Sequence, residues 1–173
     1  LGGVGSWARA GTAAVSSRAR TKADRGIRSC GIRSSLAARV DATDVPMIEL
    51  NISCPNVEEG GLAFGANYAA TEMMVREVRS VFKKPVIAKL SPEGNIVKSA
   101  EAALKGGAEI LSLINTIRGM AVDINTRRPM LANITGGLSG PAIRPIALRC
   151  LYEVKKHFKV PVIAMGGIIS LED

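Results

Sequence analysis

VPMIELNISCPN, residues 45–56, joins a short and largely apolar run to a polar loop, and this arrangement recurs three more times along the chain. Apolar runs of this length, bounded by loops, are typical of parallel strands that are buried on both faces. The strands predicted from this pattern are Val45 to Leu50, Pro85 to Leu90, Glu109 to Ile114 and Val160 to Met165. The repetition predicts an α/β chain with a parallel sheet.

Amphipathic stretches separate the predicted strands, with apolar residues three and four positions apart. The helices predicted here are Thr71 to Phe82, Gly94 to Lys105 and Ala142 to Phe158. Equivalent βα units that follow one another predict part of a (β/α)8 TIM barrel. Four strands would also suit an open, doubly wound sheet, so periodicity alone leaves both architectures open.

The composition fits one globular domain. Of the 173 residues, 47% are apolar and 22% are charged, which is enough apolar material for a core. No apolar run approaches the roughly 20 residues of a membrane span, so no membrane association is expected. The cysteines, Cys30, Cys54 and Cys150, form no C-x-x-C pair, which argues against a zinc site or a disulfide framework and favours a reducing cytoplasm.

The net charge of +8 is concentrated at the beginning of the chain. Residues 1–40 contain eight Arg or Lys and one acidic residue, whereas the remainder is near neutral. The basic segment has one aromatic residue, Trp7, and lacks the interleaved rings of a single-strand binding surface, so no nucleic-acid partner is expected. Because residues 1–33 lack periodicity, we expect a disordered basic segment there and one domain over residues 34–173.

Polar residues or glycines appear where each predicted strand ends. Asn51 and Cys54 follow the first strand, Lys89 lies near the end of the second, Asn115 follows the third, and Gly166 follows the fourth. In parallel βα proteins the carboxyl ends of the strands meet at one face, where ligands bind. The sequence therefore predicts one site that draws on all four strand ends.

Five motifs within residues 34–173 resemble those of dihydroorotate dehydrogenases and occur in the same order. They are NISCPN, VIAKLSP, SLINT, TGGLSGPAIRPIALR and IAMGGI. The fourth motif resembles the NAD-linked subclass, which has a separate electron-transfer subunit. The resemblance implies that the predicted strands are the fourth to seventh of the family's (β/α)8 barrel, with its first three strands and its eighth outside this sequence.

The resemblance also implies a reaction, the oxidation of (S)-dihydroorotate to orotate in UMP synthesis. Cys54 would remove the C5 proton, and FMN would accept the C6 hydride. A thiol suits this role because its ordinary pKa of about 8.5 leaves some thiolate at neutral pH. The substrate residues implied are Asn51, Asn56, Asn115 and Thr116. The FMN residues implied are Lys89, Ile114, Gly140, Gly166 and Gly167.

Partners follow from the same resemblance. The family implies a homodimer core and a second subunit that carries FAD and an iron–sulfur cluster and passes electrons to NAD. No metal is expected on this chain.

The residues also allow plainer explanations. A lone cysteine is most often a small buried apolar residue, which suits Cys150 in a helix better than Cys54 in a loop. An Asn after a strand is often a turn residue, although several at successive strand ends favour ligand binding. Lys89 lies within an apolar run and needs a partner, which is either a ligand or solvent at the strand end.

Glycines mark two predicted turns. Gly136, Gly137 and Gly140 lead into Pro141, which suits the first turn of a helix, so we expect backbone N–H groups there to face an anion. Gly166 and its neighbour follow the last strand, where many barrels bind a phosphate. Tight βα turns also favour glycine, so the glycines take their meaning from the motifs around them.

Two related enzymes and one inactive alternative compete with this interpretation. A dihydropyrimidine dehydrogenase module would share parts of these motifs, but that family tends to have His at the position of Asn56. A tRNA dihydrouridine synthase also has a barrel and a loop cysteine, but its motifs do not extend through residues 135–149. The third alternative is a truncated fragment that keeps the family residues but neither binds FMN nor turns over.

Overall fold

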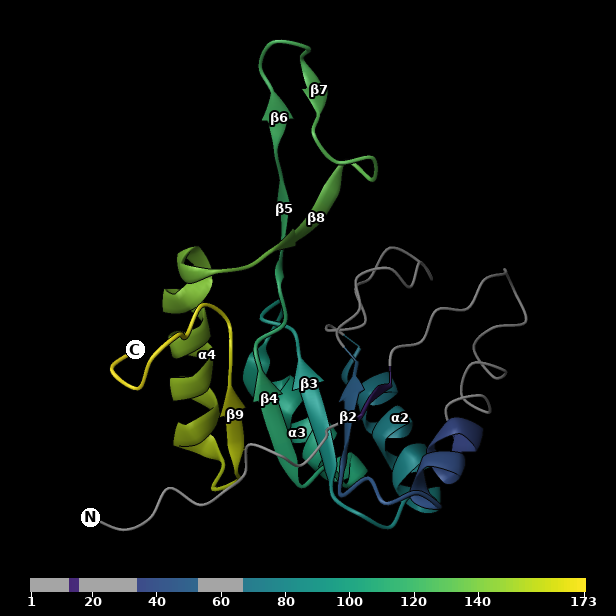
Figure 1. The fold of residues 1–173 in the computed structure, drawn as a ribbon. Coiled ribbons are helices and arrows are strands. Elements are labelled where there is room, and N and C mark those ends of the chain that lie inside the picture. Colours follow the sequence, from purple (N-terminus) through teal and green to yellow (C-terminus); the bar gives the residue numbers. More distant parts are fainter. Residues whose placement is uncertain (1–12, 16–33, 53–66) are drawn as a thin grey trace.

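The computed structural model describes residues 13–15, 34–52 and 67–173, which contain one sheet of five parallel strands (Figure 1). The strands are β1 (Ala13–Val15), β2 (Ile48–Asn51), β3 (Val86–Leu90), β4 (Ile110–Leu113) and β9 (Val162–Ala164). β3, β4 and β9 lie within the predicted runs, and β2 extends one residue beyond its run, to Asn51. β1 was not predicted, and the disorder expected for the rest of residues 1–33 falls outside the described residues.

The order of the strands decides between the two architectures that the sequence left open. The five strands lie side by side in chain order, β1-β2-β3-β4-β9, and every neighbouring pair is parallel. A doubly wound sheet reverses its strand order at a switch point, whereas a (β/α)8 barrel adds each strand beside the previous one. The sheet is therefore part of a (β/α)8 barrel, as predicted.

Helices follow the strands and begin and end at residues that suit these positions. They are a segment over residues 34–41, α2 (Tyr68–Val81), α3 (Ile96–Gly106) and α4 (Arg144–His157). The side chains of Asn67 and Asn95 cap α2 and α3 by accepting hydrogen bonds from the backbone, and Gly107 ends α3 in the left-handed region. The segment 34–41 was not predicted. No helix in the described part of the chain is long and apolar enough to span a membrane.

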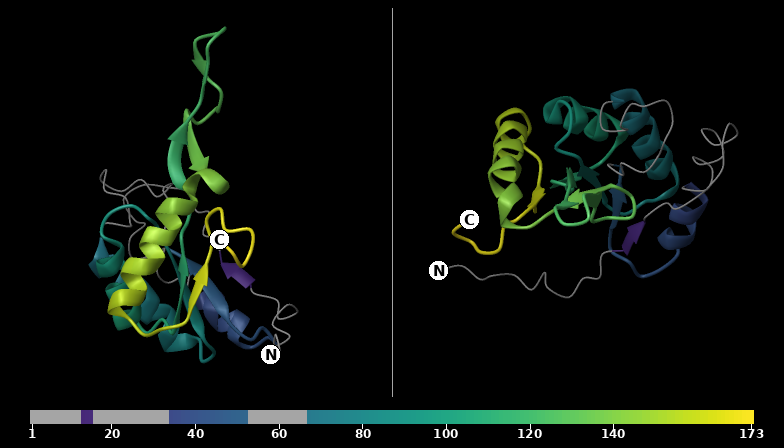
Figure 2. Two further views of the ribbon diagram at one scale, coloured as in Figure 1. Left: turned by 90° about the vertical axis from the view of Figure 1, so that its left-hand side faces the viewer. Right: turned by 90° about the horizontal axis from the view of Figure 1, so that it is seen from above.

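The hydrophobic core lies between the sheet and these helices. Seen from above, α4, α3 and α2 follow one another along one side of the sheet (Figure 2). The predicted apolar face of α2, Val75, Val78 and Phe82, is fully buried against it. α2 and α3 pack closely at Gly106, where an added Cβ would lie only 2.7 Å from the backbone oxygen of Glu72. The helix layer thus leaves the opposite face of the sheet for other contacts.

A hairpin arm interrupts the βα pattern between β4 and α4 and extends beyond the carboxyl ends of the strands (Figure 1). β5 (Ile117–Met120) pairs with β8 (Thr135–Leu138), and β6 (Val122–Asp123) pairs with β7 (Arg128–Pro129), both antiparallel. Exposed apolar residues on the arm are Met120, Val122, Ile124, Met130, Leu131, Ile134 and Leu138. The sequence did not predict this arm.

Two of the glycines predicted to form the turn before Pro141 lie in the arm instead. Gly136 and Gly137 belong to β8 and pair with β5, so they are not part of the turn that opens the helix at Pro141. Glycine at position 137 is explained by close packing in the arm, since an added Cβ would lie 2.4 Å from Oγ1 of Thr116. Pro141 does open a helical turn, the 3-10 helix η3 (Pro141–Ile143), and α4 follows directly.

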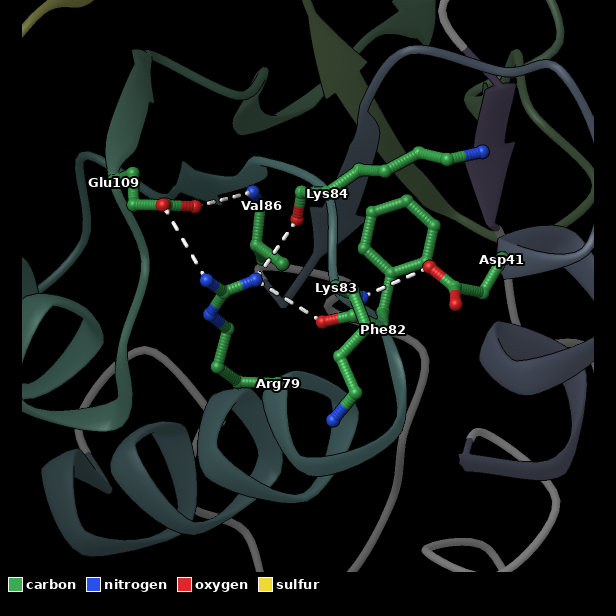
Figure 3. A network of polar contacts seen from close by, with 7 residues as sticks. All are labelled: Asp41, Arg79, Phe82, Lys83, Lys84, Val86 and Glu109. Carbon is green, nitrogen blue, oxygen red and sulfur yellow. Dashed lines mark hydrogen bonds and ion pairs between the residues drawn. The ribbon is translucent and has the colours of Figure 1, made fainter.

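A polar network closes the turn between α2 and β3 at the amino ends of the strands (Figure 3). Nη1 of Arg79 donates to the carbonyl oxygens of Phe82 and Lys84, both at 3.0 Å. Nη2 of Arg79 lies 3.5 Å from Oε1 of Glu109, whose Oε2 accepts a hydrogen bond from the backbone N–H of Val86 at 3.1 Å. The network therefore ties α2 to the beginnings of β3 and β4.

Candidate functional site

Three predicted site residues lie together at the carboxyl ends of the strands. Asn51 is the last residue of β2 and is in register with Lys89 of β3, and Asn115 follows β4. Nδ2 of Asn115 donates to Oδ1 of Asn51 at 3.2 Å. Its Oδ1 accepts from the backbone N–H of Thr116 at 2.8 Å, so the Asn115 amide has a fixed orientation. Both the ligand-site and the turn explanations of Asn115 are thus compatible with its contacts.

Cys54 and Asn56 lie outside the described residues. The described residues before this stretch end at Ile52, one residue beyond the end of β2 at Asn51. Their roles remain predictions from the motif.

Lys89 pairs with Glu49, a residue that the sequence did not single out. Nζ of Lys89 lies 3.6 Å from Oε1 of Glu49, and Oγ of Ser112 donates to Oε2 of Glu49 at 2.8 Å. Ile48 and Leu50 of β2 belong to the helix-side core, so Glu49 between them faces the other side of the sheet. The sequence predicted that a ligand or solvent would pair with Lys89. In the structure, a carboxylate of the protein also pairs with it.

This trio, Glu49, Lys89 and Ser112, is partly shielded from water. The side chains of Glu49 and Lys89 are 14% and 23% exposed, and Ser112 is fully buried. A single charge in such surroundings would be costly, and the pairing offsets that cost. The sequence did contain a signal for this trio, because Glu49 is the only charged residue in the apolar run 45–50.

Three loops meet around the predicted flavin residues Ile114, Gly140, Gly166 and Gly167. A Cβ on Gly167 would lie 2.3 Å from the backbone oxygen of Gly140, and one on Gly166 would lie 2.9 Å from Cγ1 of Ile114. Both Gly166 and Gly167 have positive φ, 109° and 81°. A Cβ on Gly140 would meet nothing within 4 Å. These residues form a bare backbone surface with open space beside Gly140.

This donor set fits a flavin phosphate and a pyrimidinedione. Bare glycine backbone before a helix allows close approach of a phosphate, and η3 begins directly after Gly140. The Asn51 and Asn115 amides both donate and accept, as the edge of a pyrimidinedione requires. Lys89 adds a cation. Among the described residues, no group of three or more His, Cys, Asp or Glu could hold a metal ion.

Cys150 provides the contrast to a catalytic thiol. It is fully buried in α4, as the sequence analysis expected for a structural cysteine. Burial raises the pKa of the Cys150 thiol, so it stays protonated at neutral pH. Its Sγ lies 3.4 Å from Nη2 of Arg149, which does not reverse that shift.

Comparisons with known proteins show what this chain is similar to. The family described as dihydroorotate dehydrogenase matches residues 34–173. The chain is similar to the NAD(+)-type dihydroorotate dehydrogenase B catalytic subunits of Alkaliphilus oremlandii (54% identical over 131 residues, 75% of this chain and 43% of that protein) and Petrotoga mobilis (51% over 136 residues, 78% and 45%). It thus spans less than half the length of these curated relatives.

A solved structure gives the same fold at low sequence identity. The dihydroorotate dehydrogenase of Eimeria tenella, in complex with ferulenol, aligns with a TM-score of 0.55 and 18% identity. The alignment covers 80% of this chain and 43% of that one. The similarity supports the partial barrel and carries no further detail of the site.

Proposed function

This chain belongs to the dihydroorotate dehydrogenase family, and from that premise we propose that it carries the flavin and substrate site of an NAD-linked catalytic subunit. The reaction is the oxidation of (S)-dihydroorotate to orotate in pyrimidine synthesis. The observation that carries the proposal is the Asn51–Asn115 hydrogen bond beside Lys89, at the carboxyl ends of three adjacent strands. Such an edge is where ligands bind in parallel βα proteins.

The protein residues divide the work in this proposal. Cys54 removes the proton from C5 of the substrate, since a loop thiol can exist partly as thiolate near neutral pH. Asn51, Asn56, Asn115 and Thr116 hold the pyrimidinedione edge and fix which carbon faces the base. FMN, when bound, supplies the acceptor for the C6 hydride.

The flavin residues are assigned by the fit of the backbone and of one charge. Gly140, Gly166 and Gly167 hold the phosphate side through backbone N–H groups, and Ile114 packs beside them. With FMN bound, Lys89 would face the ring, and its positive charge would stabilise the negative charge that the flavin gains on reduction. The names of the relatives, catalytic subunits of the NAD(+) type, support a separate electron-transfer subunit. The FAD and the iron–sulfur cluster of that subunit are part of the proposal. A homodimer core completes the proposed assembly.

The half-reaction tests this function without the partner subunit. The flavin-loaded catalytic subunit that carries this sequence is mixed with dihydroorotate in the absence of oxygen, and bleaching of the flavin absorbance is followed. Dihydrouracil, which lacks the carboxylate, is the matched control for the dihydropyrimidine dehydrogenase alternative. We expect rapid bleaching by dihydroorotate alone. A colourless protein, or equal bleaching by both compounds, would contradict the proposal.

A further inference from the structure

We propose that Glu49 is a positioning residue that holds Lys89 and offsets part of its charge, and thereby lowers the reduction potential of the flavin. This inference rests on the proposed function, in which Lys89 faces the flavin ring. The resemblance assigned no role to Glu49. What singles it out is its place on the inner face of the sheet, within reach of the one lysine assigned to the cofactor.

The position of the Glu49 carboxylate is fixed from two sides. Ser112, fully buried in β4, donates a hydrogen bond of 2.8 Å to Oε2, which leaves Oε1 directed at Nζ of Lys89. Asn51, Lys89 and Ser112 are in register across β2, β3 and β4. Glu49 precedes Asn51 by two residues and so lies on the same face of β2. Three adjacent strands therefore hold one carboxylate beneath one ammonium group.

Charge explains what this arrangement does to a flavin. Opposite charges 3.6 Å apart partly cancel at a distance, and their low exposure weakens the screening by water. Two-electron reduction of a flavin near neutral pH takes up one proton, so the reduced form carries one more negative charge than the oxidised form. Lys89 favours this extra charge and Glu49 disfavours it. Paired with Glu49, Lys89 stabilises the reduced flavin less than a lone lysine would, so the reduced flavin can pass its electrons onward.

A purely structural ion pair would behave differently. It would contribute to the stability of the fold but would leave the potential of the cofactor unchanged when its charge was removed. Glu101 and Lys105 form such a pair on the outside of α3, with 2.9 Å between Nζ and Oε1 and both side chains about half exposed. Glu101→Gln is therefore the matched control, since it makes the same chemical change in a Glu–Lys pair away from the inner face.

The experiment measures the midpoint potential of the flavin-loaded catalytic subunit against a reference dye. Glu49→Gln keeps the shape of the side chain and its bond to Ser112 but removes the charge. We expect the balance to move about tenfold toward reduced flavin, which is about 30 mV for a two-electron couple. Lys89→Met should move it the opposite way, Glu49→Asp should stay near the wild type, and Glu101→Gln should have no effect.

The double variant keeps the test decisive if Glu49→Gln alone folds poorly. In the Lys89→Met background, Glu49→Gln should again raise the potential and return it toward the wild-type value. A potential that is unchanged or lowered in both backgrounds would overturn the role of Glu49 while leaving the proposed function intact. A wild-type protein that takes up no flavin, or whose flavin dihydroorotate cannot reduce, would overturn the proposed function and this inference together.

Discussion

The two edges of the same sheet use polar side chains in opposite ways. At the amino edge, Arg79 and Glu109 bond to backbone groups of the turn between α2 and β3, and so close it (Figure 3). At the carboxyl edge, Glu49 and Lys89 contact other side chains, and Asn115 contacts both the side chain of Asn51 and the backbone N–H of Thr116. A network that satisfies backbone groups holds the fold in place, whereas linked side chains on the inner face can be presented to a ligand.

This difference matches the general division of a (β/α)8 barrel. The amino ends of its strands serve stability, and the carboxyl ends carry the chemistry. We therefore expect changes at the amino edge to affect unfolding, and changes at the carboxyl edge to affect flavin and substrate. Variants of the flavin-loaded catalytic subunit test this expectation.

The largest effect is expected for Cys54→Ala. Loss of the proposed base should slow flavin reduction by dihydroorotate at least about a hundredfold while FMN stays bound. Stopped-flow absorbance measures the rate, and the flavin content of the purified protein measures binding. Cys150→Ala is the matched control, because that buried thiol should affect stability but not rate. An unchanged rate in Cys54→Ala would remove this residue from the mechanism.

Arg79→Met tests the amino edge. The substitution keeps much of the aliphatic stem but leaves the carbonyls of Phe82 and Lys84 without their donor, so the free energy of unfolding should fall by about 2 kcal/mol. Urea unfolding measures the loss. The potential of the flavin and the affinity for orotate should match the wild type. A loss of orotate affinity without a loss of stability would break the comparison between the edges.

Asn115→Ala should weaken orotate binding by about 1.5 kcal/mol, roughly tenfold, because a buried polar group of the ligand would lose its partner. The shift in flavin absorbance on titration with orotate gives the dissociation constant. Asn133→Ala, an exposed residue of the arm, is the control and should bind orotate normally. An unaltered affinity in Asn115→Ala would count against its role in substrate binding.

The smallest effect is expected for Glu109→Gln. Its carboxylate is about half exposed and 3.5 Å from Arg79, and ion pairs of this kind contribute less than about 1 kcal/mol. Chemical unfolding of both variants under the same conditions compares it with Arg79→Met. A loss as large as that of Arg79→Met would show that the ion pair, rather than the bonds to the carbonyls, holds the turn.

Much of the fold was predictable because its apolar pattern is regular. β2, β3, β4 and β9 and helices α2, α3 and α4 fall within a few residues of the predicted runs. The arm was missed because its strands are only two to four residues long and depend on pairing across the hairpin. β1 was missed for a similar reason, since three small apolar residues gain meaning only beside β2.

The candidate site was predictable in part. The rule that strand ends converge anticipated the proximity of Asn51, Lys89 and Asn115, although their roles stay predictions. The contact of Glu49 with Ser112 was not predictable, because 63 residues separate them and it depends on the register of three strands. The turn positions of Gly136 and Gly137 were wrong because the arm places both residues in β8.

The contact between Gly167 and Gly140 has a consequence for how this chain tolerates mutation. A Cβ at position 167 would collide with backbone, whereas one at position 140 would meet open space and only an unfavourable φ of 87°. In a saturation library selected for function, both positions should therefore retain glycine, position 167 because a Cβ would collide with backbone and position 140 because φ 87° with ψ −172° is a conformation essentially restricted to glycine. Two loops 27 residues apart in sequence would then each keep a glycine at the point where they touch, one for lack of space and the other for its backbone conformation.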